Sequence, residues 1–178
     1  MCVKMQLKKG SYDLDDLVKF VFSTYKATNG AYPLLEWVEK KPSIDDFATF
    51  EKIYKPFLKK RMEEEFDEFY FIEENELIGT VALVYKFKGK EIEWIPKRLK
   101  RKENGFIEFL LVSPVHQGKG YGKMLLEFAI KRLNELNKNA YVVTSKKLPA
   151  FNFYKKFGFV EYGDYNGFVI LMYKGEKC

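Results

Sequence analysis

Cysteine and histidine are scarce in this chain of 178 residues. The two cysteines, Cys2 and Cys178, lie near opposite ends of the sequence, and His116 is the one histidine. Disulfide-rich folds need several cysteines, and zinc sites need closely spaced cysteine and histidine ligands. The sequence therefore excludes both classes and predicts two reduced thiols and no bound metal.

Long apolar runs are also missing. No stretch approaches the ~20 consecutive apolar residues of a transmembrane helix. The first residues, MCVKMQLKKG, contain no apolar core followed by a small-residue cleavage site, as a secretory signal would. We therefore expect a cytoplasmic protein with no membrane partner, and the length suits a single domain over residues 1–178.

Positive charge exceeds negative charge, with a net charge of +6 at pH 7. This excess favours partners that carry phosphate, whether nucleic acid or an anionic cofactor. The densest run, 97-KRLKRK-102, lies in a polar and basic segment that we interpret as an insertion at about residues 86–105. Sites for single-stranded nucleic acid usually place aromatic residues among their cations. This run contains none, so nucleic acid is the less favoured partner.

Apolar residues at helical spacing predict helices in several parts of the chain. Residues 14–25 show this spacing, and Asp13 can cap the helix that they form. Ser43 and Asp46 together predict the start of a second helix. Pro56 should break or kink this second helix, because its ring clashes with the preceding turn. The further predicted helices are 125–136, beyond the glycines, and 149–157.

Alternating or continuous apolar residues predict the strands. A buried central strand is predicted at 106–112, where nearly every residue is apolar. The order of elements predicts an α/β fold, with a mixed twisted sheet of about six to seven strands and helices on both faces. The other predicted strands are 3–8, 69–72, 77–85, 140–144, 159–162 and 168–173, the last two joined through 163–167.

Three glycines, Gly118, Gly120 and Gly122, stand between the predicted central strand and the helix that follows it. A helix N-terminus carries unpaired N–H groups and a partial positive charge. Glycines let a ligand approach the backbone closely. Lys119 and Lys123 add positive charge, so the loop is typical of a phosphate-binding site.

Two common phosphate loops do not fit this spacing. A Walker loop ending at Gly122 needs glycine at position 117 and serine or threonine at 124, where the chain has Gln117 and Met124. A dinucleotide loop needs glycine at 123 or at 125, where the chain has Lys123 and Leu125. Both nucleotide-binding classes are therefore excluded.

A third pattern matches. Residues 117–122 fit Q/R-x-x-G-x-G/A directly after the predicted central strand, and residues 150–159 fit A-x-x-x-Y-x-x-x-G-F. With both motifs in this order, the chain resembles the GNAT superfamily of acyl-CoA-dependent N-acyltransferases. The resemblance is specific over about residues 106–159, and the N-terminal half agrees only in its order of elements.

The resemblance implies acetyl-CoA as acyl-donor substrate and an amine acceptor. In such enzymes the glycine loop holds the coenzyme A pyrophosphate, and the end of the central strand pairs with the pantetheine arm. The N–H of Val112 could also polarise the thioester carbonyl. The residues expected to bind the donor are Leu110, Leu111, Val112, Gln117, Gly118, Lys119, Gly120, Tyr121, Gly122 and Lys123.

Two residues are expected to move protons. Tyr154 occupies the family's general-acid position and would protonate the leaving sulfur. Glu108 is the candidate general base, since it is the only charged residue between positions 106 and 112 and should share the face of Leu110 two residues later. The alternative for Glu108 is a salt-bridged structural residue. His116 is expected to have a packing or surface role.

One position departs from the family pattern. Many relatives carry asparagine seven residues before the tyrosine, where this chain has Lys147. The donor contacts around Lys146 and Lys147 are therefore open, although a lysine could reach a phosphate.

The acceptor is not named by the sequence. The first helices and the loop between them commonly shape the acceptor site in the family, and the basic insertion is a candidate rim. Its cations argue against a polycationic acceptor. The alternative to an enzyme is a catalytically silent acyl-CoA-binding sensor or interaction module, and a homodimer stays open. The aromatic candidates in this region are Tyr32 and Trp37, together with Phe47, Phe50 and Tyr54, which we expect to be core.

Overall fold

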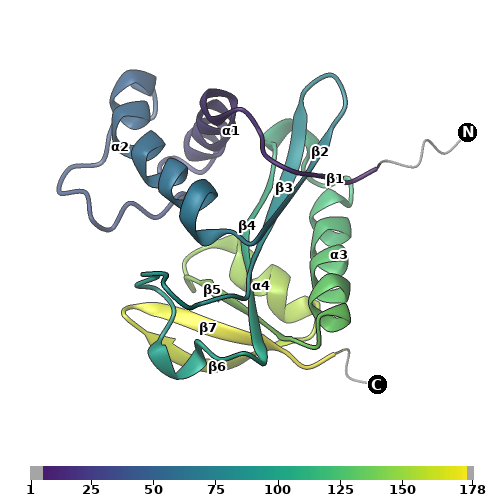
Figure 1. Ribbon diagram of the computed structural model, residues 1–178. Helices are drawn as coiled ribbons and strands as arrows, with labels where there is room; N and C mark the ends of the chain where they lie inside the picture. Colours follow the sequence, from purple (N-terminus) through teal and green to yellow (C-terminus); the bar gives the residue numbers. More distant parts are fainter. Residues whose placement is uncertain (1–5, 176–178) are drawn as a thin grey trace, which may run out of the picture.

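The computed structural model describes residues 6–175, which form one seven-stranded mixed sheet with helices on both faces (Figure 1). The strand order is β1-β2-β3-β4-β5-β7-β6, and every neighbouring pair is antiparallel except β4 and β5. The predicted fold class is therefore confirmed. The strands are β1 (Lys8–Lys9), β2 (Glu68–Glu73), β3 (Leu77–Val84), β4 (Asn104–Val112), β5 (Asn139–Thr144), β6 (Phe159–Tyr165) and β7 (Phe168–Tyr173).

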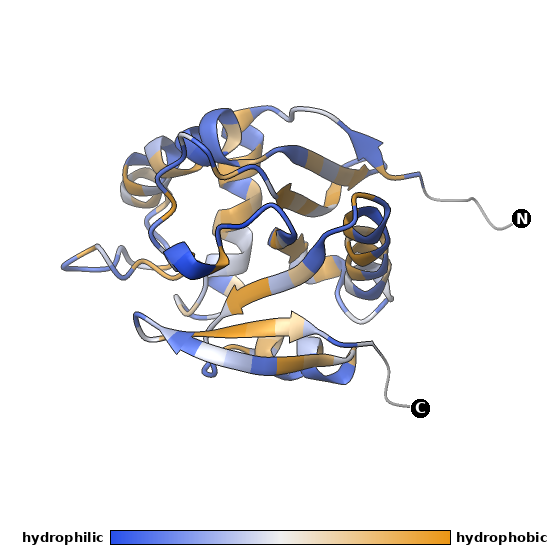
Figure 2. Cartoon of the chain, turned by 60° about the horizontal axis from the view of Figure 1, so that its bottom comes forward, coloured by the Kyte–Doolittle hydropathy of each residue, from blue (hydrophilic) through white to orange (hydrophobic). Residues whose placement is uncertain are grey.

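The helices divide between the two faces of the sheet. The first face carries α1 and α2, whose buried side chains pack with Phe109 and Leu111 of β4. The second face carries α3, which packs with Ile107 of β4. Figure 2 shows the hydrophobic strands at the centre of the molecule and hydrophilic residues on its outer surfaces. The helices are α1 (Leu14–Ala27), α2 (Phe47–Lys60), α3 (Tyr121–Glu135) and α4 (Pro149–Lys156), with short turns η1 (Arg61–Glu65), η2 (Lys97–Leu99) and η3 (Pro114–His116).

Helix α3 lies unusually close to the sheet. A Cβ atom on Gly105 would lie 2.6 Å from Cδ2 of Leu133, and one on Gly79 would lie 2.9 Å from Cδ1 of Leu125. Real Cβ contacts are not that short, so glycine at these two strand positions lets α3 approach. This close packing fixes the start of α3 relative to the end of β4.

The basic insertion is more than a polar loop. Ile92, Ile95 and Leu99 are buried and form a third cluster with Phe106 and with residues of β5 and β7. Phe106 contacts Tyr141 of β5 through stacked rings 5.4 Å apart. The segment 86–103 therefore covers the first face of the sheet beside α2. Lys97, Arg98, Arg101 and Lys102 are exposed, whereas Lys90 is 15% exposed and pairs with Asp67 at 2.7 Å.

The predicted helix starts are partly correct. Asp13 caps α1 as predicted, and its Oδ1 accepts a hydrogen bond from the N–H of Asp16 at 2.9 Å. Helix α2 begins after Asp46, whose Oδ1 accepts from the N–H of Thr49 at 3.0 Å, and Ser43 lies before the helix.

Of the break or kink predicted at Pro56, the break is wrong and the kink stays a prediction. Helix α2 runs through Pro56 to Lys60 and continues into the π turn η1. Pro56 and Lys52, whose carbonyl loses its helical partner, both lie on the exposed side of α2. Water can satisfy that carbonyl, which reduces the cost of an internal proline.

The strand predictions fit except at two ends. Half of the predicted strand 3–8, residues 3–5, lies outside the described residues. Gln6 and Leu7 are not in a strand, and β1 is Lys8–Lys9. Strand β6 continues to Tyr165 because the turn to β7 needs only Asn166 and Gly167, with φ of +51° and +82°. Such a two-residue turn matches the twist of the strands that it joins.

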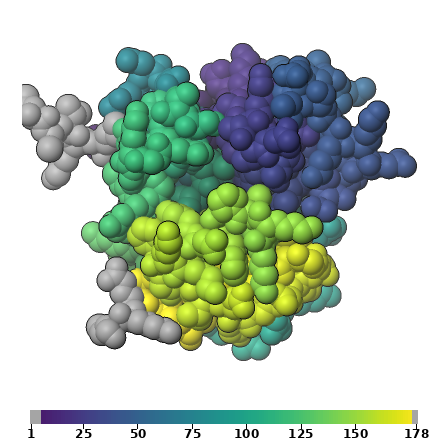
Figure 3. Space-filling view, turned by 180° about the vertical axis from the view of Figure 1, so that it is seen from behind, coloured from purple at the N-terminus to yellow at the C-terminus, as the bar shows by residue number. Residues whose placement is uncertain are grey.

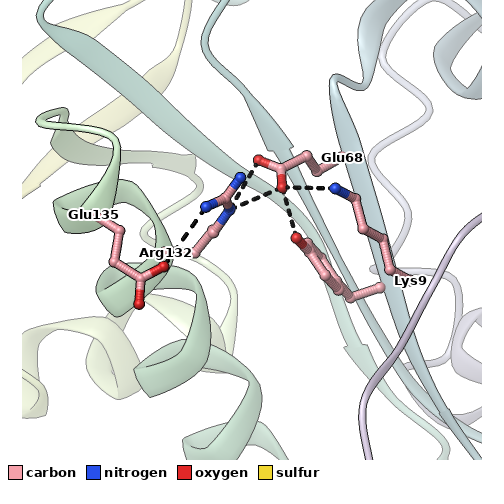
Figure 4. Close-up of polar contacts among 5 residues, drawn as sticks. Lys9, Glu68, Arg132 and Glu135 are labelled. Carbon is pink, nitrogen blue, oxygen red and sulfur yellow. Dashed lines mark hydrogen bonds and ion pairs between the residues drawn. The ribbon is translucent and has the colours of Figure 1, made fainter.

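A buried carboxylate joins β1, β2 and α3 (Figure 4). Glu68 of β2 accepts hydrogen bonds from Arg132 Nε at 2.9 Å and from Tyr70 Oη at 2.6 Å. Its Oε1 also lies 3.3 Å from Lys9 Nζ, and Glu135 lies 3.6 Å from the other side of the Arg132 guanidinium. This network ties the edge strand and α3 to the same position on β2.

Candidate active site

A β-bulge in β4 sets the geometry of the site. Ala82 of β3 pairs with Glu108, but Thr80 pairs with Leu111, so one β3 residue faces two residues on β4. Phe109 takes a φ of +51°, and its carbonyl accepts a hydrogen bond from Thr80 Oγ1 at 2.9 Å. An extra residue of this kind reverses the alternation of side chains along the strand.

The bulge corrects the expected placement of Glu108. Ile107, Leu110 and Val112 pack on the α3 face, whereas Phe109 packs on the α1–α2 face. Glu108 contacts residues on the α1–α2 face, so it does not share the face of Leu110 as the sequence predicted. The strand thus directs Glu108 to the α1–α2 face and Leu110 and Val112 to the α3 face.

Strands β4 and β5 part soon after they meet. Their parallel ladder joins Asn104–Phe106 to Asn139–Tyr141, whereas β4 continues to Val112 and β5 to Thr144. Within the described residues, β5 therefore offers no ladder partner to the second half of β4. An unpaired strand edge can pair with an extended molecule laid along it.

The glycine loop follows directly at the end of β4. Gly118 and Gly120 take φ of +77° and +89°, and no atom lies within 4 Å of the position that a Cβ would occupy at either residue. Within the described residues no side chain caps α3 at Gly120, so the first N–H groups of that helix lack such a partner. Lys119 and Lys123 are exposed beside them. The loop therefore has the open backbone and positive field that suit a phosphate group.

Glu108 lies in a buried polar cluster. Its Oε2 accepts a hydrogen bond from the Arg61 guanidinium at 2.8 Å, and its Oε1 accepts one from the Trp94 indole at 3.1 Å. Its side chain is 11% exposed. Burial raises the pKa of Glu108, although the Arg61 charge and the two hydrogen bonds oppose this effect.

Sequence reasoning missed both partners of Glu108. Arg61 is separated from Glu108 by 47 positions and Trp94 by 14. Arg61 stands in the run 59-KKRMEEE-65, which is typical of an exposed helix end, and no local signal marks it as buried. The apolar residues around Trp94 were the one indication that the insertion contacts the core.

Tyr154 of α4 is buried and lies near the same cluster. Its ring meets Phe159 edge to face at a centroid distance of 5.5 Å, and the residue is 7% exposed. Burial raises the pKa of Tyr154 well above its ordinary value, and negative charge on Tyr32 or Glu108 would raise it further. The phenol therefore stays protonated and can donate a proton.

Tyr32 connects the two proton-transfer candidates. Burial raises the pKa of Tyr32 to about 12, the Arg61 charge lowers it, and the Glu108 charge raises it. The charges of Tyr32 and Glu108 both affect the pKa of Tyr154, so the three groups interact electrostatically.

Figure 3 shows the molecular surface hollowed where α1, the residues at the start of α3 and the region of α4 meet.

The remaining aromatic candidates separate into core and surface. Phe50 and Tyr54 are fully buried, and Phe47 is half-buried against Phe22 at a centroid distance of 5.2 Å, as predicted for core residues. Trp37 is 53% exposed and packs against Phe57 with tilted rings whose centroids are 4.6 Å apart.

His116 and the lysines before α4 lie outside the Glu108 cluster. The imidazole of His116 packs near Tyr121, and its Nε2 lies 3.6 Å from Glu76. This position fits the expected packing role. Lys146 and Lys147 are exposed, and Lys146 lies 3.5 Å from Glu161.

Comparison with known proteins identifies the family. The chain matches the model of the acetyltransferase (GNAT) family over residues 31–159. The match includes the parted strands, the glycine loop and Tyr154. The protein belongs to the GNAT family of acetyltransferases.

Solved structures share the fold. A proposed acetyltransferase from Pyrococcus horikoshii is 47% identical, with a TM-score of 0.77 over 94% of this chain and 96% of its own. The PaiA N-acetyltransferase of Thermoplasma acidophilum, in complex with coenzyme A, is 19% identical, with a TM-score of 0.59 over 96% and 99% of the two chains. An acetyltransferase of Bacillus subtilis in complex with CoA is 18% identical, with a TM-score of 0.60 over 96% and 98%.

One further comparison and one property of the helices complete this description. None of the curated proteins matches the chain. Among residues 6–175, none of the helices has the length and apolar character needed to span a membrane.

Proposed function

We propose that this protein is an acetyl-CoA-dependent N-acetyltransferase that moves the acetyl group directly to a primary amine. The observation that carries the proposal is the junction of three features at one end of β4. The first feature is the edge of β4 that β5 leaves unpaired. The second is the open glycine loop at the uncapped start of α3. The third is the buried, protonated Tyr154.

The chain's residues fit the donor. Leu110, Leu111 and Val112 would pair with the pantetheine arm along the edge that β5 leaves unpaired. The open backbone from Gly118 to Lys123 would hold the pyrophosphate. A Cβ at Gly118 or Gly120 would project into that open space, so the glycines suit close approach of a phosphate. The remaining loop residues proposed to contact the donor are Gln117, Lys119, Gly120, Tyr121 and Gly122.

Tyr154 would act as the general acid. A departing thiolate has an ordinary pKa of about 8.5, so it gains from a proton supplied as the bond to carbon breaks. The raised pKa of the Tyr154 phenol keeps that proton available at neutral pH. The N–H of Val112 would donate to the carbonyl oxygen, where negative charge develops.

Glu108 would act as the general base. A protonated amine must lose a proton before it can attack, and burial raises the pKa of Glu108 and so makes its carboxylate a better acceptor. Its bonds to Arg61 and Trp94 also fit a structural ion pair, which remains the alternative for this residue.

The direct test combines binding and turnover. Thermal unfolding with and without acetyl-CoA measures donor binding, because a ligand that binds the folded state raises the unfolding temperature. Release of free CoA is then measured with a panel of small amines, peptides with a free N-terminus and lysine peptides. We expect a higher unfolding temperature and CoA release with at least one amine.

The alternatives give different results. No thermal shift with acetyl-CoA would contradict both the enzyme and the acyl-CoA sensor. A shift without CoA release for any amine would instead support a catalytically silent binding module.

A further inference from the structure

Arg61 is an unusual residue to find buried. Its side chain is 10% exposed, although arginine is almost never enclosed without partners. It begins the π turn η1, in which the N–H of Phe66 bonds to the carbonyl of Arg61 at 2.9 Å. Turns of this type inside helices are frequent at functional sites. The local backbone therefore departs from the regular helix at the residue that reaches Glu108.

Aromatic rings surround the Arg61 guanidinium. The Arg61 guanidinium carbon lies 4.9 Å from the ring centroids of both Phe66 and Trp94, and 5.7 Å from that of Phe57. A planar cation held against aromatic rings has its N–H groups pointing in fixed directions. Those directions are occupied by carboxylates, since Nη2 donates to Glu108 at 2.8 Å and Nε donates to Glu65 at 3.3 Å.

Two carboxylates share this one cation. Both Glu65 and Glu108 are largely buried, and the pKa of Glu65 is raised by burial and by the negative charge of Glu108. The other titratable groups near Glu108 are Tyr32 and Tyr154, which are neutral at ordinary pH. Arg61 is therefore the positive charge that faces the Glu108 carboxylate.

We propose that Arg61 is the positioning residue of the acetyl-transfer site: it holds the Glu108 carboxylate ionised and directed, in competition with Glu65. This role rests on the proposed function of Glu108 as the base. Trp94 completes the arrangement from the segment 86–103, so that segment contributes to the site as well as covering the sheet.

The chain contains a built-in probe for this proposal. It has two tryptophans, and the indole N–H of Trp94 donates to Glu108 Oε1 at 3.1 Å. In a Trp37→Phe background, the one indole N–H resonance in a nitrogen-15 correlation spectrum belongs to Trp94. Its chemical shift followed against pH reports the ionisation of Glu108, and Glu108→Gln should abolish that titration.

Three variants in this background test the role of Arg61. Arg61→Gln should move the titration midpoint up by about 1–3 pH units, since an opposite charge at this distance lowers the pKa of a carboxyl by that amount. Glu65→Gln should move it down, because the competing carboxylate is removed. Arg61→Lys should give a smaller rise than Arg61→Gln, because the charge remains and the planar fork is lost.

The outcomes separate this proposal from the proposed function. An unshifted midpoint in Arg61→Gln would overturn the role of Arg61 and leave acetyl transfer untouched, since the measurement needs neither donor nor acceptor. If Arg61→Gln does not fold, midpoints unchanged in both Glu65→Gln and Arg61→Lys overturn it instead. Failure of the proposed function would appear separately, as the native chain releasing no CoA with any amine. Undiminished CoA release in Glu108→Gln would instead remove Glu108 as the base.

Discussion

At the scale of single residues, burial raises the pKa of both Tyr154 and Glu108, and the higher pKa suits the different role proposed for each. A low-dielectric environment disfavours the charged form of each group, so it raises the pKa of both. The phenol remains a proton donor, and the carboxylate becomes a better proton acceptor. The same desolvation thus prepares one group as an acid and the other as a base.

Replacement of Tyr154 by phenylalanine should lower kcat by about 10²–10⁴-fold, the usual contribution of a positioned proton donor. Binding of acetyl-CoA should hardly change, because the ring is retained. The matched control is Tyr162→Phe on β6, where the side chain is 45% exposed. CoA release and thermal shift measure the two effects, and undiminished turnover in Tyr154→Phe would rule out the assigned acid.

The pH dependence of kcat/KM should rise on its acidic side through the raised pKa of Glu108, because only the ionised carboxylate accepts a proton. Tyr154 must be protonated to act as the acid. Because its pKa is raised, activity should be lost on the alkaline side only at a pH above the ordinary pKa of tyrosine. Glu108→Gln should remove the acidic limb. A limb that persists in this variant would assign the titration to another group.

At the scale of elements, the glycine loop depends on backbone conformation more than on side-chain packing. Gly118 has a φ of +77° with open space where a Cβ would stand, and Gly89 in the segment 86–103 has the same φ and is equally open. An alanine would therefore be equally strained at both positions, and only Gly118 lies in the loop proposed to bind the donor.

Gly118→Ala and Gly89→Ala should each lower the free energy of unfolding by about 1–2 kcal/mol, the cost of a left-handed backbone for a residue with a Cβ. Only Gly118→Ala should also weaken binding of acetyl-CoA. Chemical denaturation and titration with acetyl-CoA measure the two quantities. Equal affinity in both variants would contradict the assignment of the loop.

Sequence alone could predict those elements whose signals are local. The cap at Asp13, the glycine loop and Tyr154 each follow from residues within one turn or one motif. The bulge at Phe109 has no such signal, because it depends on how β3 and β4 align. One extra residue there placed Glu108 on the unexpected face, and with it the contacts to Arg61 and Trp94.

At the scale of the whole molecule, the Glu68 network joins the first strand to α3 across the second face of the sheet (Figure 4). Burial would raise the pKa of Glu68, but hydrogen bonds from Tyr70, Arg132, Tyr85 and Lys9 together lower it. A carboxylate with a lowered pKa in the folded state stabilises the fold above its unfolded pKa. That stability is lost as pH falls through the lowered value.

Glu68→Gln should lower the free energy of unfolding at neutral pH by about 2 kcal/mol, the scale of hydrogen bonds to a charged group. It should also flatten the loss of stability below pH ~4.5 that the ionised residue causes. The control is Glu135→Gln, because Glu135 is 51% exposed and exposed pairs contribute less than about 1 kcal/mol. Denaturation curves at several pH values measure both, and equal acid sensitivity in Glu68→Gln and the native chain would contradict the assignment.

The parting of β4 and β5 has a mechanical consequence. The two halves of the sheet, β1–β4 and β5–β7–β6, are joined along the ladder by the three residue pairs from Asn104 to Phe106. Bending at that short seam would open or close the wedge between them without rupture of the other ladders. A molecule paired with the edge of β4 inside the wedge would contact both halves of the sheet and hold them at a fixed separation. Occupancy of the wedge would then stiffen the protein far from the contact, and amide exchange should slow in β7 as well as in β4.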